Sequence, residues 1–285
     1  MDLDPDIDPC VAPDPTHQSG DRGPVHELRL FLIAVQFFTR VPIPNWVGFQ
    51  PAWLHQCARY FPAVGLAVGA VAALVLWGAA QLFALPVAVL LSMAATLVLT
   101  GGFHEDGWAD SCDGLGGHVT RERALEIMKD SRIGAYGAMG LVLMLGLKAA
   151  TLASLPLDWG CAALLIGHTA SRSASTALIR FLPYAGDIEH AKAKPLAQHI
   201  SNAGCVVACA WPVPLAAALA LWQPLWWVPA AGSLLLAAVG GWACARWLRR
   251  RLGGVTGDTL GATQQITELL ILLAWAAAWG AVSRG

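Results

Sequence analysis

Charged residues are scarce in this chain. Asp, Glu, Lys and Arg together make up 13% of its 285 residues, whereas soluble domains average about 25%. Hydrophobic residues reach 56%, so the composition indicates a membrane protein with several spans rather than a soluble one. The formal net charge is −1, which provides no basic field to attract a polyanion. We therefore expect membrane lipid around the chain and no nucleic-acid partner.

Paired cysteine motifs are also absent. The seven cysteines form no C-x-x-C pair, and most of them lie in apolar runs, so we expect buried thiols rather than a disulfide or zinc framework. The first 24 residues are acidic and rich in proline, and they lack the basic region and apolar core of a signal peptide. We expect residues 1–24 to be a disordered tail and residues 25–285 to form a single transmembrane catalytic domain.

Long apolar runs, in contrast, are abundant. A membrane span needs about 20 apolar residues. Seven segments meet this requirement, namely 61–83, 85–103, 134–154, 159–182, 203–222, 224–246 and 264–282. Arg29 and Arg40 interrupt the segment 25–44, which predicts an interfacial helix instead. The sequence predicts an all-α fold, a polytopic membrane helix bundle with about seven transmembrane helices.

The distribution of Lys and Arg indicates the orientation of this bundle. Under the seven-span topology, fifteen of the 18 basic residues fall on one side of the membrane and only Arg284 falls on the other. Lys148 and Arg172 lie within spans, and we expect Lys148 to extend toward the outer surface. Because cytoplasmic loops carry an excess of Lys and Arg, the N-terminus and the long loops are predicted to be cytoplasmic.

An acidic motif follows the second apolar run. "GGFHEDGWADSCDGLGG" (101–117) places four carboxylates within nine residues. If the helix continues, Asp106, Asp110 and Asp113 share one face at i, i+4 and i+7. Carboxylates this close repel one another and raise one another's pKa. A divalent cation bound between them would offset this repulsion, and oxygen ligands suit Mg²⁺ or Mn²⁺. Glu105 points about 100° away, as a ligand of a second site or a base. The alternative, a solvated acidic helix end, is disfavoured because three acids stand in register without a basic partner.

Cations and hydroxyls that could bind phosphate occur in three other places. Lys129, Ser131 and Arg132 precede the third predicted span, where they either contact phosphate or anchor the span. Arg172 lies within the fourth span, and an ionisable residue at membrane depth indicates a functional site. Lys192 and Lys194 follow that span and either contact a nucleotide or anchor the loop.

Two further acids lie near the last predicted span. Asp258 is flanked by glycine in "GDTLGA" (257–262), and Glu268 lies one turn inside that span. Asp258 either completes a metal site or caps a helix. Glu268 either pairs with Arg172 or assists the metal, and the sequence does not decide between these roles.

Several motifs occur together in one order. They are "FFTRVPIP" (37–44), "FPAVGLAVG" (61–69), the acidic motif, "RALEIMKDSRIGAYG" (123–137) and "GDTLGA". With these motifs, residues 28–275 resemble the cobalamin synthase family, the adenosylcobinamide-GDP ribazoletransferases. The resemblance implies a Mg²⁺-dependent integral membrane enzyme of the bacterial inner membrane. The distribution of Lys and Arg predicts that its active site is cytoplasmic. The enzyme would transfer adenosylcobinamide phosphate from its GDP ester to α-ribazole or α-ribazole 5′-phosphate, release GMP and close the nucleotide loop of vitamin B12.

The resemblance and the residue chemistry together assign roles. The predicted catalytic residues are His104, Glu105, Asp106, Asp110 and Asp113. The predicted metal ligands are Glu105, Asp106, Asp110, Asp113 and Asp258. The predicted substrate-binding residues are Arg40, Lys129, Ser131, Arg132, Arg172, Lys192 and Lys194.

Two other functions stay open. A CDP-alcohol-type membrane phosphotransferase would share the metal chemistry, and a cation transporter would use the acids as its ion path. The transporter is disfavoured because polar groups crowd the cytoplasmic half of the predicted bundle. The sequence leaves the oligomeric state open.

Overall fold

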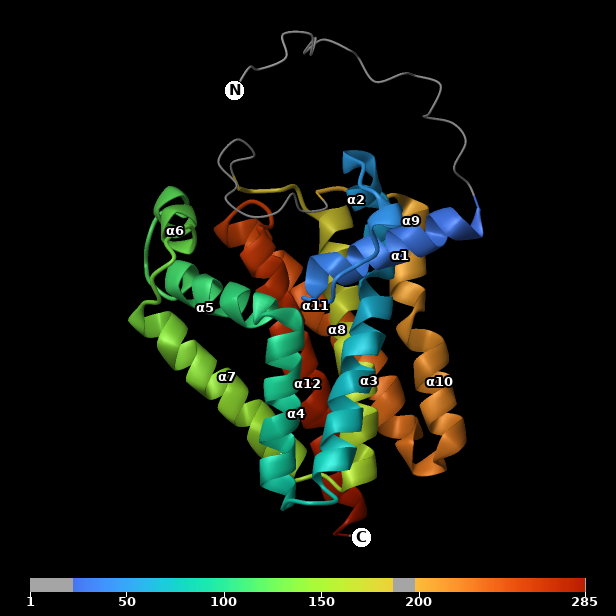
Figure 1. Ribbon diagram of the computed structural model, residues 1–285. Helices are drawn as coiled ribbons and strands as arrows, with labels where there is room; N and C mark the ends of the chain where they lie inside the picture. The colour runs from blue at the N-terminus through green and yellow to red at the C-terminus, as the bar shows by residue number, and fades with distance from the viewer. Residues whose placement is uncertain (1–22, 187–197, 285) are drawn as a thin grey trace, which may run out of the picture.

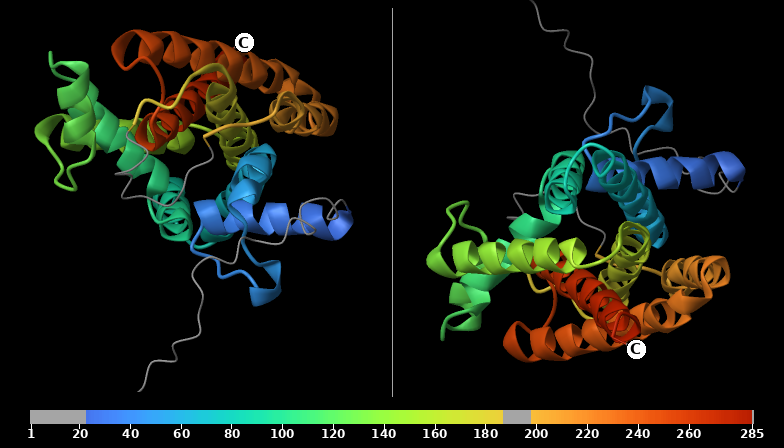
Figure 2. Two further views of the ribbon diagram at one scale, coloured as in Figure 1. Left: turned by 90° about the horizontal axis from the view of Figure 1, so that it is seen from above. Right: turned by 90° about the horizontal axis from the view of Figure 1, so that it is seen from below.

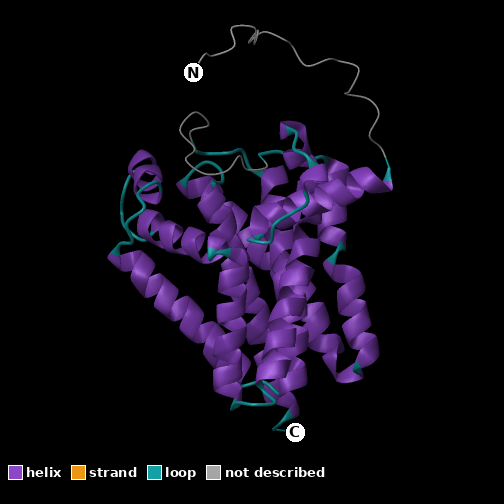
Figure 3. Ribbon diagram, viewed as in Figure 1, coloured by secondary structure: helices purple, strands orange, loops and turns teal. Residues whose placement is uncertain are grey.

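The structure is a computed structural model that describes residues 23–186 and 198–284. Its described residues form helices and loops, without a β-strand (Figure 3). The helices are α1 (Pro24–Phe38), α2 (Pro51–Cys57), α3 (Phe61–Ala79), α4 (Leu85–Thr100), α5 (Phe103–Leu115), α6 (Arg121–Met128), α7 (Ala135–Ala153), α8 (Leu157–Phe181), α9 (Asn202–Ala210), α10 (Pro212–Trp222), α11 (Trp227–Arg251) and α12 (Gly257–Val282). The all-α prediction is confirmed. The predicted tail lies almost entirely outside the described residues.

Five helical stretches of the described chain are long and apolar enough to cross a membrane. They are Pro51–Ala79, Ala135–Ala153, Asn202–Trp222, Pro224–Arg251 and Gly257–Val282. The bent pair α4 and α5 makes a sixth if it is one span. The predicted span 159–182 corresponds to α8, which is not among the five. Its hydroxyl, His and Arg side chains lower its hydropathy, yet most of its residues are buried in the bundle. About seven spans is therefore an approximate count.

A sharp break separates α4 from α5. Gly101 and Gly102 have φ angles of 72° and 70°, in the left-handed region that glycine adopts without a steric penalty. The two helix axes consequently differ by 89°, and α5 runs across one end of the bundle (Figure 1). We call this the α5 end. The helix of the second predicted span therefore does not continue straight into the acidic motif, and the acids stand on a new helix.

The α5 end also carries α1 and α6. Helix α1 crosses this end as well, and in the view along the bundle α1 and α6 project on opposite sides (Figures 1 and 2). The structure is therefore in agreement with the prediction that α1 is not a span. The helix ends at Phe38, before Pro42 and Pro44, so its extent is shorter than the predicted segment 25–44. The C-terminus lies at the opposite end of the bundle (Figure 1).

Glycines set two close helix contacts that position the site. A Cβ at Gly65 of α3 would lie 2.3 Å from the His168 carbonyl oxygen on α8, so only glycine lets these helices approach so closely. A Cβ at Gly107 of α5 would lie 2.8 Å from the Asp258 carbonyl oxygen on α12. This second contact brings the N-terminus of α12 against the acidic helix.

Candidate active site

A cavity of about 500 Å³ opens at the α5 end. The residues that line it come from the end of α1 and the loop after it, the α4–α5 break, one face of α5, the loop before α7 and α7 itself. They are Phe37, Thr39, Arg40, Thr100, Gly101, Gly102, Phe103, Glu105, Asp106, Ala109, Asp110, Ser131, Ile133 and Leu141. We call it the α5 cavity. It brings together five of the predicted site residues: Arg40, Glu105, Asp106, Asp110 and Ser131.

Arg40 supplies the positive charge of this cavity. Its backbone N–H donates to the Leu99 carbonyl at 2.8 Å, which attaches the segment after α1 to the end of α4. Its side chain lies over Gly101, where a Cβ would come within 2.7 Å of the Arg40 Nε. Gly101 is therefore required twice, for the left-handed turn and for the space that the guanidinium occupies.

Asp106 and Asp110 stand one helical turn apart on the cavity wall. Helix α5 lies across the end of the bundle, outside the long spanning helices. Partial burial and the nearby Asp106, Asp258 and Asp113 raise the pKa of Asp110 to about 7. The negative charges of neighbouring acids disfavour the ionisation of Asp110. A divalent cation bound between the carboxylates would offset this repulsion.

The acids of the α5 cavity suit Mg²⁺ only if a bound substrate supplies further ligands. Among the described residues, no three His, Cys, Asp or Glu side chains converge closely enough to hold a metal ion by themselves. Mg²⁺ is usually held by one or two carboxylates, with substrate phosphates and waters filling the other positions. Asp106 and Asp110, facing an open cavity, match that pattern. Asp258 contributes charge from the α12 side.

Glu105 links the α5 cavity to the interior of the bundle. Its Oε1 accepts a hydrogen bond of 3.0 Å from Gln265 Nε2 on α12. Its Oε2 is buried without a hydrogen-bond partner among the described residues. A buried carboxylate oxygen left unpaired is costly, so this atom marks a position where a bound group would be stabilised.

Asp113 binds backbone N–H groups at the start of α7. Its Oδ2 accepts from the Gly134 N–H at 2.7 Å and its Oδ1 from the Gly137 N–H at 2.8 Å. A Cβ at either glycine would lie within 2.5 Å of a carboxylate oxygen. Although it shares the α5 face with Asp106 and Asp110, it is not among the described residues that line the cavity. It attaches the first turn of α7 to α5, and so fixes the loop that carries Ser131.

We expect Asp113→Asn to weaken the fold with little effect on metal binding. The amide keeps one acceptor but loses a charge-assisted bond, so the free energy of unfolding should fall by about 1–3 kcal/mol. Calorimetric titration should find at most a small change in Mg²⁺ affinity, since Asp113 is the least of the causes that raise the pKa of Asp110. Asp158→Asn, which removes an exposed acid from the opposite end of the bundle, is the control. A clear loss of Mg²⁺ affinity in Asp113→Asn, but not in the control, would show that Asp113 is a metal ligand.

His104 and Arg172 are buried behind the cavity wall. The His104 ring is 4% exposed and stacks on Phe38 with 5.2 Å between ring centroids. Arg172 is 2% exposed and donates from Nη1 to the His168 carbonyl at 3.0 Å. Neither is among the described residues that line the α5 cavity. The predicted phosphate contact of Arg172 thus has no support in this geometry, and the base role of His104 stays a prediction.

The other predicted cations lie elsewhere. Arg132 is exposed and pairs with Asp130 at 2.6 Å, and Lys129 is exposed at the end of α6. Neither is among the described cavity residues. Lys192 and Lys194 lie outside the described residues.

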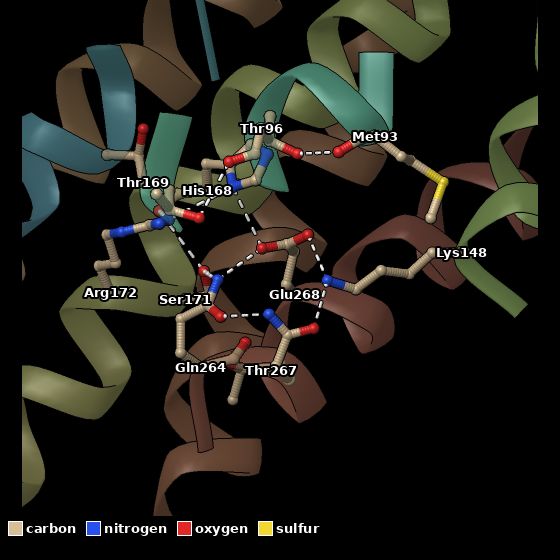
Figure 4. Close-up of polar contacts among 12 residues, drawn as sticks. Met93, Thr96, Lys148, His168, Thr169, Ser171, Arg172, Gln264, Thr267 and Glu268 are labelled. Carbon is tan, nitrogen blue, oxygen red and sulfur yellow. Dashed lines mark hydrogen bonds and ion pairs between the residues drawn. The ribbon is translucent and has the colours of Figure 1, made fainter. Parts of the chain in front are cut away.

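A buried polar network lies within the bundle, and Figure 4 shows its part around Lys148, His168 and Glu268. Lys148 Nζ on α7 lies 2.6 Å from Glu268 Oε1 on α12, and it also donates to Gln265 Oε1 at 2.7 Å. The other Glu268 oxygen lies 3.1 Å from His168 Nδ1. Gln265 then reaches Glu105, so an unbroken chain of contacts joins Lys148 to the α5 cavity.

This network corrects two expectations. Lys148 is 5% exposed and points inward, so the prediction that it extends to the outer surface is wrong. Glu268 forms its ion pair with Lys148 rather than with Arg172. Gln264 and Gln265 were not selected from the sequence as site residues. The sequence does contain a pattern that indicates them, because Gln264, Gln265 and Glu268 are polar residues close together within an otherwise apolar span.

Comparisons with known proteins identify the family of the chain. A family model described as cobalamin-5-phosphate synthase matches residues 30–276. A protein of Leptothrix cholodnii named adenosylcobinamide-GDP ribazoletransferase is 59% identical over 261 residues, which cover 89% of this chain and 97% of that protein. Proteins of the same name from Vibrio cholerae and a Polaromonas species are each 46% identical, over 87% and 86% of this chain and 93% and 95% of their own lengths. No solved structure matches the chain. The chain belongs to the cobalamin-5-phosphate synthase family.

Proposed function

We propose that this chain is an adenosylcobinamide-GDP ribazoletransferase of the membrane. It joins adenosylcobinamide-GDP to α-ribazole or α-ribazole 5′-phosphate and releases GMP. The observation that carries the proposal is the α5 cavity, where Arg40 and three acids of α5 line one space in a chain of this family. A phosphoryl transfer needs this combination of positive charge and metal-binding carboxylates.

Different residues of the cavity have different roles in this reaction. The hydroxyl of the ribazole attacks the phosphorus that carries cobinamide, the bond to the bridging oxygen breaks, and GMP leaves. Mg²⁺ held by Asp106 and Asp110 would neutralise charge on the pyrophosphate. Arg40 donates to phosphate oxygens, and Ser131 offers a hydroxyl on the same wall. Glu105, held by Gln265, is placed to accept the proton of the attacking hydroxyl.

The proposed location is the bacterial inner membrane, with the α5 cavity on the cytoplasmic side. Its support is the distribution of Lys and Arg, since cytoplasmic loops carry the excess of basic residues. Single cysteines at the exposed positions His118 and Glu122 should react with a membrane-impermeant thiol reagent only in inverted vesicles. Reaction in right-side-out vesicles would refute the orientation.

A product assay tests the activity. The purified full chain is incubated with adenosylcobinamide-GDP, α-ribazole and Mg²⁺, and we expect GMP and the closed-loop corrinoid in equal amounts. A second arm offers α-ribazole 5′-phosphate in place of α-ribazole. Release of CMP from a CDP-linked lipid, with no GMP in either arm, would instead assign the chain to the CDP-alcohol type.

We expect the Mg²⁺ requirement to depend on pH. Asp110 has a pKa raised from its ordinary 3.8 to about 7, so without metal it is ionised above pH 7 and protonated below. Metal binding must then release one proton, and the Mg²⁺ concentration for half-maximal rate should rise about tenfold per pH unit below 7. Measurements of rate against Mg²⁺ at pH 6 to 8 check this. In Asp110→Asn the slope should become clearly shallower; an unchanged slope would assign the titration to another group.

A further inference from the structure

A second cavity, of about 580 Å³, lies between α8, α10 and α11. Its floor includes Ala237, Ala238 and Gly241 of α11, and its walls include Leu178 and Phe181 of α8 and Val213 of α10. We call it the α11 groove. It is separate from the α5 cavity, with which it shares none of its lining residues.

The sequence of α11 explains why a groove forms here. Residues 234, 237, 238, 241 and 245 recur at spacings of three and four, so they share one face of the helix. Four of these five are Ala or Gly, and such small side chains leave the helix surface hollow. At Gly241 a Cβ would already lie 3.3 Å from the Ala174 Cβ on α8, so the floor is closed beneath the groove.

The rim of the groove is apolar and faces outward. Phe181, Val213 and Trp242 are 64%, 52% and 65% exposed. The stretch Pro224–Arg251, which contains α11, is one of those able to cross a membrane. An apolar, open groove on such a helix faces lipid chains rather than water.

Three arginines continue the same face of α11 at the α5 end. Arg246, Arg249 and Arg250 line the end of the groove. The Arg246 guanidinium lies 5.9 Å from the centroid of the Trp242 ring, and Arg249 Nη2 donates to the Phe181 carbonyl at 3.0 Å. Among the described residues that line the groove there is no carboxylate. The cluster is thus complementary in charge to a phosphate.

We propose that the α11 groove binds an anionic glycerophospholipid. One acyl chain occupies the hollow face of α11, and the phosphate contacts the three guanidinium groups. The volume lies within the roughly 300–1,000 Å³ of small-molecule sites. A free phosphate would use only the charged end, whereas the charged end and the apolar hollow form one continuous space. Basic pockets between membrane helices bind anionic headgroups in this way.

Native mass spectrometry of the full chain in detergent tests the proposal. Added phosphatidylglycerol should be retained as one molecule per chain, and phosphatidylcholine should not. Arg250→Gln should weaken retention about fivefold, the effect of one basic residue near an anionic headgroup. Arg123→Gln, which removes an exposed charge from α6, should not. Ala238→Trp should fill the hollow and abolish retention, and Ala243→Trp, at another exposed position of α11, should leave it intact.

The same experiment can overturn the proposal. Equal retention by Arg250→Gln and Arg123→Gln, or by Ala238→Trp and Ala243→Trp, would refute the site. Full displacement of the lipid by soluble glycerol phosphate would make the cluster a phosphate site only. If Ala238→Trp alone converted a dimer to a monomer in light scattering, with lipid retention unchanged, the groove would belong to a second copy of this chain. Circular dichroism establishes that each variant folds, and the two Arg variants decide the outcome if Ala238→Trp does not.

Discussion

Asp106→Asn and Asp110→Asn should each lower the rate of GMP release by about 10²-fold or more, or about 3 kcal/mol. Each change keeps the size of the side chain and one acceptor oxygen but removes an anionic ligand from the wall of the α5 cavity. The Mg²⁺ concentration for half-maximal rate should rise as well, because each variant binds the cation less tightly. Rates measured over a wide range of Mg²⁺ concentrations separate the two effects.

The control is an acid at the same end of the bundle that does not line the cavity. Glu122→Gln removes an exposed carboxylate of α6, and exposed charges contribute little, so its rate and Mg²⁺ dependence should match those of the unchanged chain. Near-normal turnover in both Asn variants would show that these carboxylates do not hold the metal. It would leave the assignment of the family untouched but remove the mechanism proposed here.

Lys148→Met should lower the free energy of unfolding by about 3–5 kcal/mol. Lys148 and Glu268 are 5% and 4% exposed, and the substitution leaves the Glu268 carboxylate buried without the ammonium group that lies 2.6 Å from it. The variant should also lose activity, because Lys148 holds Gln265 and Gln265 holds Glu105. Titration with a denaturing detergent, followed by circular dichroism, measures the stability.

A second substitution distinguishes the ion pair from simple packing. Lys148→Met combined with Glu268→Gln removes both charges, so most of the lost stability should return. Arg123→Met, which removes an exposed cation of similar length, should cost less than about 1 kcal/mol. If the double variant is as unstable as Lys148→Met, the loss comes from packing around the Lys148 chain, and the ion pair is not its cause.

The sequence by itself determined the class of fold and the position of the acids. Scarce charge and long apolar runs indicate a membrane bundle because only a helix satisfies its own backbone in lipid. The spacing of Asp106 and Asp110 places them on one helix face wherever that helix begins. That conclusion held although the helix starts at Phe103 and not within the preceding span. Local spacing is sufficient for contacts within one helix.

Only the tertiary structure decided which side chains meet across helices. Asp113 has the same spacing as the other two acids, yet it binds backbone N–H groups of Gly134 and Gly137, 21 and 24 residues away. Lys148 points inward because it forms an ion pair with Glu268, which lies 120 residues further along the chain. Arg172 donates to the His168 carbonyl and its guanidinium lies 5.9 Å from the centroid of the Phe38 ring, so it does not reach the cavity. These contacts depend on how α5, α7, α8 and α12 pack against one another. Close packing arises only in the assembled bundle, so it cannot be predicted from the sequence of one helix alone.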